Sequence, residues 1–284
     1  MNHHPSYRVG QTRWSVTIAT YVALVVASTI YVYPFLIQLG TSFKTDEDAT
    51  AHPLNPLPQT WTTNAFHELA QVDFPRWFLN SVVVAVLVTV GRVFFDSLAG
   101  YALARLHFRG RSALFGAIVA VMAVPSVVLL IPKFLVLNQL GIYNTYTGMI
   151  VPLVTDAAGV FIMKQFFESI PPSVEEAAHI DGAGPFRTFW SVTLPMSRPA
   201  LITLTILSFQ GSWNELAHFV VSRDKPSLNT LTSGVATLVS GTLGKGNEFP
   251  LKLAPALLMT IPVAVLFFIF QRYIMRSAEG AVKE

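Results

Sequence analysis

The sequence predicts an all-α integral membrane protein that crosses the bilayer with six helices. Of its 284 residues, 52% are hydrophobic and only 12% are charged, about half the roughly 25% that a soluble domain carries. The apolar residues also form long uncharged blocks, such as 112–132 and 253–270, and a helix needs about 20 apolar residues to cross hydrocarbon. A chain of this composition could not cover a water-facing surface of ordinary polarity.

Hydropathy predicts spans at residues 14–39, 77–106, 112–132, 147–167, 200–221 and 253–272. The first block is too long for the apolar region of a signal peptide, so we interpret it as an uncleaved span with its N-terminus inside. Lys and Arg are then more frequent in the inner segments than in the outer ones, as is typical of cytoplasmic loops. We expect cytoplasmic segments at 1–13 and 273–284, flanking one membrane domain at 14–272.

Several kinds of chemistry are disfavoured by the composition. The chain has no cysteine, so it offers neither a disulfide nor a thiolate metal ligand. Two Glu-x-x-His matches, Glu176 to His179 and Glu215 to His218, fall in an inner loop and a span, so they are not expected to share a metal. The net charge of +3 is explained by membrane orientation rather than by nucleic acid. Gly244-Lys245 lacks the other residues of a phosphate loop.

The longest inner connection, residues 168–199, has the signals of two short helices. Ser173 and Glu176 have the spacing of a capping box, and Gly182 stands where a left-handed residue ends a helix, which predicts a helix over 174–181. Pro185 suits the first turn of a second helix, which Leu194-Pro195 would stop. An ordinary surface loop is the alternative.

A run within this connection resembles the EAA loop of ABC-importer permeases. It has E-A-A, two residues, D-G-A and later L-P, at Glu176, Ala177, Ala178, Asp181, Gly182, Ala183, Leu194 and Pro195. Two shorter runs, AGYALAR at 99–105 and WNE at 213–215, and the tail at 280–283 resemble the carbohydrate-uptake (maltose-type) branch of that family. The similarity covers nearly the whole chain and is greatest to the smaller permease subunit.

The resemblance implies a fold and a set of partners. The expected fold is the six-transmembrane-helix ABC-importer permease fold, in which the EAA helix is a coupling helix that docks on a cytoplasmic ATPase. The coupling residues would be Glu176, Ala177, Ala178, Asp181 and Gly182. Partners would be a second permease, two ATPase subunits, an extracytoplasmic solute-binding protein and membrane lipid in a bacterial cytoplasmic membrane. The chain would be no enzyme and hold no cofactor, with ATP and Mg on the ATPase.

Charged residues inside the predicted spans need partners or a function. Arg92 and Asp96 are four residues apart in the second span and are expected to pair with each other, although contact with solute is the alternative. Asp156, in the fourth span, has no partner that the sequence reveals. It is either a functional carboxylate or a hydrogen-bonding group between helices.

The fifth span carries a polar face. Its residues Gln210, Trp213, Asn214 and His218 recur at helical spacing, and polar side chains at bilayer depth must face protein or water. An aromatic ring beside amides suits a sugar, so these four residues are the candidate translocation path. The alternative is hydrogen bonding between helices.

Two rival functions remain. A self-sufficient secondary transporter would show internal repeats and discontinuous helices in both halves, and the EAA-like loop would be unexplained. A membrane-embedded enzyme would need converging ionisable groups, whereas the His, Asp and Glu residues are scattered along the sequence. The sequence favours a permease subunit that moves an oligosaccharide or related polyol inward.

Overall fold

The computed structural model describes residues 14–240 and 248–281, and all regular structure in these two stretches is helical. Four helical stretches are long and apolar enough to cross a membrane, and two sharply bent helix pairs bring the number to six if each pair is one span. The all-α membrane class is therefore confirmed. The four stretches lie in α1 (Trp14–Thr41), in α4 (Phe74–Arg105), in residues Tyr146–Ser169 and in α15 (Phe249–Ala281).

The described chain divides into two compact units. One contains residues 14–68 and 248–257, with α1, the short α2 (Asp46–Ala51) and most of α3 (Asn64–Leu69). The other contains residues 69–240 and 258–281 and holds the remaining helices. The α15 helix begins in the first unit and continues into the second.

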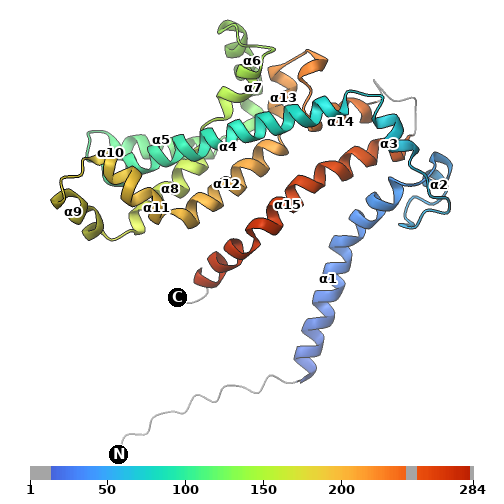
Figure 1. Ribbon diagram of the computed structural model, residues 1–284, viewed down its shortest axis with the longest axis horizontal. Helices are drawn as coiled ribbons and strands as arrows, with labels where there is room; N and C mark the ends of the chain where they lie inside the picture. Colours follow the sequence, from blue (N-terminus) through green and yellow to red (C-terminus); the bar gives the residue numbers. More distant parts are fainter. Residues whose placement is uncertain (1–13, 241–247, 282–284) are drawn as a thin grey trace, which may run out of the picture. The chain divides into compact units, whose positions relative to one another are not determined.

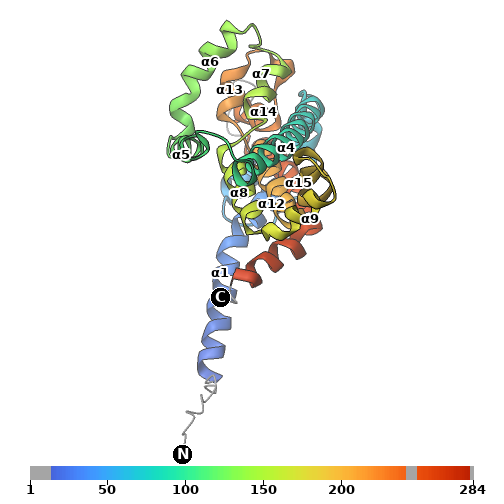
Figure 2. The same cartoon turned by 90° about the vertical axis from the view of Figure 1, so that its left-hand side faces the viewer.

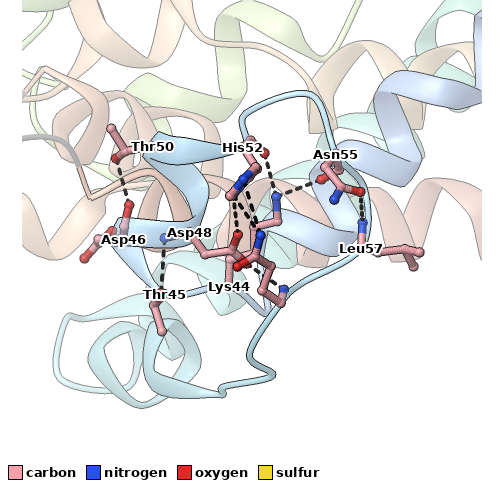
Figure 3. Close-up of polar contacts among 9 residues, drawn as sticks. Lys44, Thr45, Asp46, Asp48, Thr50, His52, Asn55 and Leu57 are labelled. Atoms are coloured by element: carbon pink, nitrogen blue, oxygen red, sulfur yellow. Dashed lines mark hydrogen bonds and ion pairs between the residues drawn. The ribbon is translucent and has the colours of Figure 1, made fainter.

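A buried lysine organises the segment that follows α1 (Figure 3). The side chain of Lys44 is 1% exposed, and its Nζ donates to the carbonyl oxygens of His52 and Asn55, each at 2.7 Å. The carboxylate of Asp48 accepts from the backbone N–H of Gln59 at 2.8 Å. Loss of the Lys44 ammonium would leave the carbonyls without this donor, a cost of about 1–3 kcal/mol for an unsatisfied buried group.

In the second unit, α4 packs against α8 (Ala157–Ser169) and α12 (Arg198–Trp213) (Figure 1). Buried apolar side chains fill the space between them, including Tyr101, Met163 and Phe167. Small residues let these helices approach. A Cβ at Gly100 would lie 2.8 Å from the Cβ of Met163, so no larger residue fits there without a shift.

The third predicted span is bent rather than straight. The helices α5 (Arg111–Met122) and α6 (Leu130–Gln139), with the η1 turn (Ser126–Leu129) before α6, meet at 99°. Figure 2 shows α6 leading away from α5. Pro125 stands at the break with an extended ψ of 127°. A helix breaks readily at a proline, because proline has no N–H for the helix and disfavours helical geometry in the residue before it. The span predicted at 112–132 therefore falls within a sharply bent helix pair, residues 111–139, rather than within one straight helix.

The fifth predicted span also differs. A helical segment, Pro185–Met196, meets α12 at 82°, and α12 ends at Trp213, before a separate helix α13 (Ala217–Ser222). A continuous helix over 200–221 was therefore wrong. In contrast, α15 runs on to Ala281, so most of the predicted tail at 273–284 continues the last helix. Residues 1–13 and 282–284 lie outside the described chain.

Shorter elements complete the second unit. Before α8 come α7 (Tyr146–Ile150) and the η2 turn (Val151–Leu153). After it come α9 (Pro172–Ile180), α10 (Pro185–Thr188), a π-helical turn η3 (Phe189–Thr193) and α11 (Leu194–Met196). Beyond α13 lie η4 (Pro226–Leu228) and α14 (Leu231–Val239).

Candidate functional site

The predicted coupling helix is present as α9, at the same end of the unit as α10 and α11 (Figure 1). It starts earlier than expected, after Pro171, and Ser173 lies inside it. The predicted capping box was therefore wrong. Proline suits the first helical turn because its missing N–H would have no partner there, and Pro172 occupies that turn. The second predicted helix begins at Pro185, but helical turns continue through Leu194–Met196 instead of stopping at Leu194-Pro195.

The C-terminal end of α9 agrees with the prediction. Gly182 has a φ of +77°, the left-handed conformation expected from its place after the helix. Its N–H donates to the carbonyl of His179 at 3.0 Å, and the N–H of Ala183 donates to the carbonyl of Ala178 at 2.9 Å. These two bonds form a Schellman motif, which fixes the direction in which the chain leaves α9.

The two faces of α9 differ in exposure. Glu176, Ala177 and Asp181 are exposed, whereas Ala178 is buried at 8%. Two large apolar side chains stand in solvent at this end, Ile180 at 87% exposed and Phe186 at 68%. Large apolar side chains exposed on a loop that is predicted to lie outside the membrane are consistent with an interaction surface. The helix therefore has one face that packs on its own chain and one that remains open.

An ion pair that the sequence analysis missed holds the packed face. The Nε of Arg105, at the end of α4, lies 3.3 Å from Oε1 of Glu175, and both side chains are nearly buried, at 11% and 12% exposed. Thr193 donates its hydroxyl to the same Oε1 at 3.3 Å. Arg105 also donates to the backbone carbonyls of Phe167, at 2.5 Å, and Ile170. A single guanidinium thus links α4, the end of α8 and α9.

The residues of the candidate path are not all on one surface. Gln210 and Asn214 are exposed, but Trp213 is 2% exposed and His218 is 1% exposed. The helical spacing fails after Trp213 because α12 ends there, with Asn214 as its C-cap. Only Gln210 and Asn214 therefore remain available on the surface of this chain.

Trp213 has a packing role within the chain. Its ring stacks on Phe209 at 5.5 Å between centroids and meets the ring of Phe78 edge-on at 5.9 Å. Its Nε1 donates to the carbonyl of Met259 at 3.1 Å. The indole is covered by these contacts, so it offers no face for stacking of a solute.

The break after α12 is fixed by hydrogen bonds to Glu215 and His218. The Oε1 of Glu215 accepts from the backbone N–H of His218 at 2.8 Å, which caps the first turn of α13. The Nε2 of His218 lies 3.1 Å from the carbonyl oxygen of Met149. His218 therefore connects α13 with α7 inside the unit.

The charged residues of the spans pair differently from the prediction. Asp96 accepts at Oδ1 from the hydroxyl of Thr155 at 2.8 Å and from the backbone N–H of Asp156 at 3.0 Å. Arg92 donates from Nε to the carbonyl of Leu153 at 2.7 Å, and its Nη1 lies 3.9 Å from Oδ2 of Asp156. The predicted Arg92–Asp96 pair was wrong, because residues before α8 provide partners for both side chains. Asp156 has a partner after all, in another helix.

The chain is similar to known transport proteins over almost its full length. A family model described as a binding-protein-dependent transport system inner membrane component matches residues 96–279, a range that includes α9 and α12. The chain is 30% identical over 272 residues to the inner membrane ABC transporter permease protein YcjP of Escherichia coli (strain K12), which covers 94% of this chain and 96% of the relative.

Other relatives are named for particular solutes. The chain is 30% identical over 259 residues to the arabinooligosaccharides transport system permease protein AraQ of Halalkalibacterium halodurans, covering 89% of this chain and 92% of the relative. It is 28% identical over 280 residues to the sn-glycerol-3-phosphate transport system permease protein UgpE of Yersinia pestis bv. Antiqua (strain Antiqua), covering 96% and 99%.

A solved structure shares the fold. A chain of a bacterial ABC transporter involved in the import of the acidic polysaccharide alginate superposes with a TM-score of 0.80 at 23% identity, over 94% of this chain and 99% of that one. The chain therefore belongs to the family of binding-protein-dependent transport system inner membrane components, the membrane permeases of ABC importers.

Proposed function

We propose that this chain is one of two membrane subunits of an importer for an oligosaccharide or related polyol, driven by ATP hydrolysis on a separate subunit. The two-faced helix α9 carries the proposal. Its Glu175 face is tied to α4 and α8 through Arg105, while Glu176, Ala177 and Ile180 stand open at its other face. A helix that is tied to the membrane helices on one face and exposed on the other could transmit a movement of a bound partner to those membrane helices.

The open surface suits an ATPase subunit as that partner. Ala177 leaves a smooth approach for another protein, and the carboxylates of Glu176 and Asp181 are available for basic side chains. Ile180 and Phe186 add apolar area that a partner would cover. The complete importer would contain a second permease, two ATPase subunits and an extracytoplasmic solute-binding protein, with ATP and Mg held by the ATPase subunits and no cofactor on this chain.

Copurification tests this function. An ATPase subunit should copurify with the wild-type chain from its native membrane, and Glu176→Lys should reduce the amount at least severalfold, because it reverses a charge that we place at the interface. His107→Lys is the matched control, since His107 is exposed in the loop between α4 and α5. Equal ATPase recovery with all three chains would argue against coupling through α9.

The solute class is proposed from relatives and from the exposed amides of α12. Two relatives are named for arabinooligosaccharides and sn-glycerol-3-phosphate. Both solutes carry hydroxyl groups, and the second also carries a phosphate. Gln210 and Asn214 present amides that donate to and accept from hydroxyls. We therefore place the translocation route along the side of α12 that carries Gln210 and Asn214. The buried side chains of Trp213 and His218 would pack behind this surface and stabilise it.

Both termini are proposed to be cytoplasmic. Under this topology, α9 lies on the ATPase side and the Lys44 segment lies outside. Cysteines introduced singly at Ser6 and Ala278 should stay unlabelled by an impermeant thiol reagent in intact cells, whereas cysteine at Thr50, which is exposed in α2, should be labelled. Rapid labelling of the cysteine at position 278 in intact cells would contradict this topology and would place the C-terminus outside.

A further inference from the structure

An ion pair with a half-exposed carboxylate lies near the middle of the membrane-spanning helix α4. Arg92 lies well inside α4, which spans Phe74–Arg105, and its Nη1 is 3.9 Å from Oδ2 of Asp156. The arginine side chain is 15% exposed and the aspartate side chain is 45% exposed. A carboxylate at this depth is costly when it faces lipid, so such residues face protein or a water-filled cavity. The exposed half of Asp156 therefore needs a polar neighbour outside this chain.

The backbone around Asp156 points to the same conclusion. The helix is broken between η2, which ends at Leu153, and α8, which begins at Ala157. Asp156 occupies this break with extended angles, φ −142° and ψ 134°. Irregular backbone at membrane depth is tolerated where it is buried in protein or lines a water-filled cavity. Because Asp156 is not buried, the second situation fits the break.

The pair also adjoins the polar side of α12. A Cβ at Gly211 would lie 3.6 Å from Nη1 of Arg92. Gly211 lies three residues before Asn214, and Gln210 lies four residues before it, so each is a neighbour of Asn214 on the helix surface. All three positions are exposed. The guanidinium, the carboxylate and the two amides thus border one surface formed by α4, α8 and α12.

We propose that the Arg92–Asp156 pair stands in the water-filled translocation route and balances its charge, so that the route accepts uncharged, hydroxyl-bearing solutes. The proposal rests on the route proposed along α12. Hydroxyl groups both donate and accept, so they can bond to the carboxylate of Asp156 and to the guanidinium of Arg92. Together the two groups carry no net charge, whereas either one alone would favour solutes of opposite charge.

Single cysteines in this cysteine-free chain test water access. The probes are anionic methanethiosulfonate ethylsulfonate and cationic methanethiosulfonate ethyltrimethylammonium, added to both faces of membranes that contain the assembled transporter. Asp156→Cys should react with both probes. Ser208→Cys, at a buried position, and Val90→Cys, which is exposed on the opposite side of α4 from Arg92, should react at least about tenfold more slowly, because charged probes are excluded from lipid and protein interiors.

Charge balance is measured with the same probes at Asn214→Cys. The ratio of anionic to cationic reaction rates should rise by about threefold to tenfold in Asp156→Asn, as expected if the charge acts on the probe over roughly 10 Å or less in a largely aqueous space. It should fall by a similar factor in Arg92→Gln. An unchanged ratio in both variants would overturn the charge-balancing role.

The outcomes separate this inference from the proposed route. If Asn214→Cys reacts but Asp156→Cys stays as slow as Ser208→Cys, the pair faces lipid or the second permease, and the inference fails while the route stands. If neither Asn214→Cys nor Gln210→Cys reacts, the route along α12 is itself wrong and the inference falls with it.

Discussion

Gly182→Pro should abolish the association of this chain with its ATPase partner while the chain still inserts into the membrane. Proline fixes φ near −65°, whereas Gly182 has a φ of +77°. The substitution also removes the N–H that donates to His179. A cost of about 3 kcal/mol or more is expected for proline in an incompatible position, which corresponds to a loss of association on the order of a hundredfold. The readout is the ATPase recovered per purified chain.

Gly184→Pro is the matched control. Gly184 has a φ of −73° and a ψ of 167°, angles that proline adopts and that also suit the residue before Pro185. ATPase recovery should therefore stay within about twofold of wild type in that variant. Gly182→Asn should lose little, since asparagine tolerates the left-handed region. Equal ATPase recovery with Gly182→Pro and Gly184→Pro would contradict the role of the α9 turn.

The sequence predicted the features that local chemistry determines. The four long helical stretches and the two bent helix pairs overlap the six predicted spans, because each span is long and mostly apolar. The end of α9 was predicted correctly because glycine is favoured after a helix, where the backbone adopts the left-handed conformation. Gly182 has that conformation. The EAA-like run identified the family correctly, since the family match covers residues 96–279.

Long-range pairing was not predictable from the sequence. Arg92 was assigned to Asp96 because the two are one helical turn apart, but Asp156, distant in sequence, is its observed partner. The break after Trp213 was missed because no proline or charge run marks it. Its stabilising contacts come from Met149 and Thr232, whose hydroxyl donates to the carbonyl of Glu215 at 2.7 Å. Helical spacing therefore predicts which residues share a face within α12, but it does not apply to residues after the helix ends.

The neighbouring residues Glu175 and Glu176 illustrate the same limit. The resemblance drew attention to Glu176, which is exposed, whereas the side chain of Glu175 is 12% exposed and paired with Arg105. The sequence did not distinguish the two glutamates, because the face of α9 that is covered can be identified only after the helix boundaries are known. Val174 and Ala178, one turn apart on the buried side, are the signal that identifies the packed face once the helix boundaries are known.

Glu175→Ala should destabilise the chain itself, whereas Glu176→Ala should not. Removing one partner of a nearly buried ion pair leaves the other charge uncompensated, at a cost of about 3–5 kcal/mol. Glu175→Ala should therefore lower the thermal unfolding midpoint of the purified chain and the yield of assembled transporter. Glu176→Ala removes an exposed carboxylate, so its unfolding midpoint should match wild type while ATPase recovery falls.

A double variant separates the ion pair from general disruption of α9. If Glu175 matters because of Arg105, adding Arg105→Met to Glu175→Met removes the uncompensated charge, so the pair of changes should cost less than the sum of the two single changes. Full recovery is not expected, because Arg105 also donates to the carbonyls of Phe167 and Ile170. Strictly additive shifts in the unfolding midpoint would show that the two side chains act independently, and the connection between α4 and α9 would then have to depend on apolar packing around Val174 and Phe189.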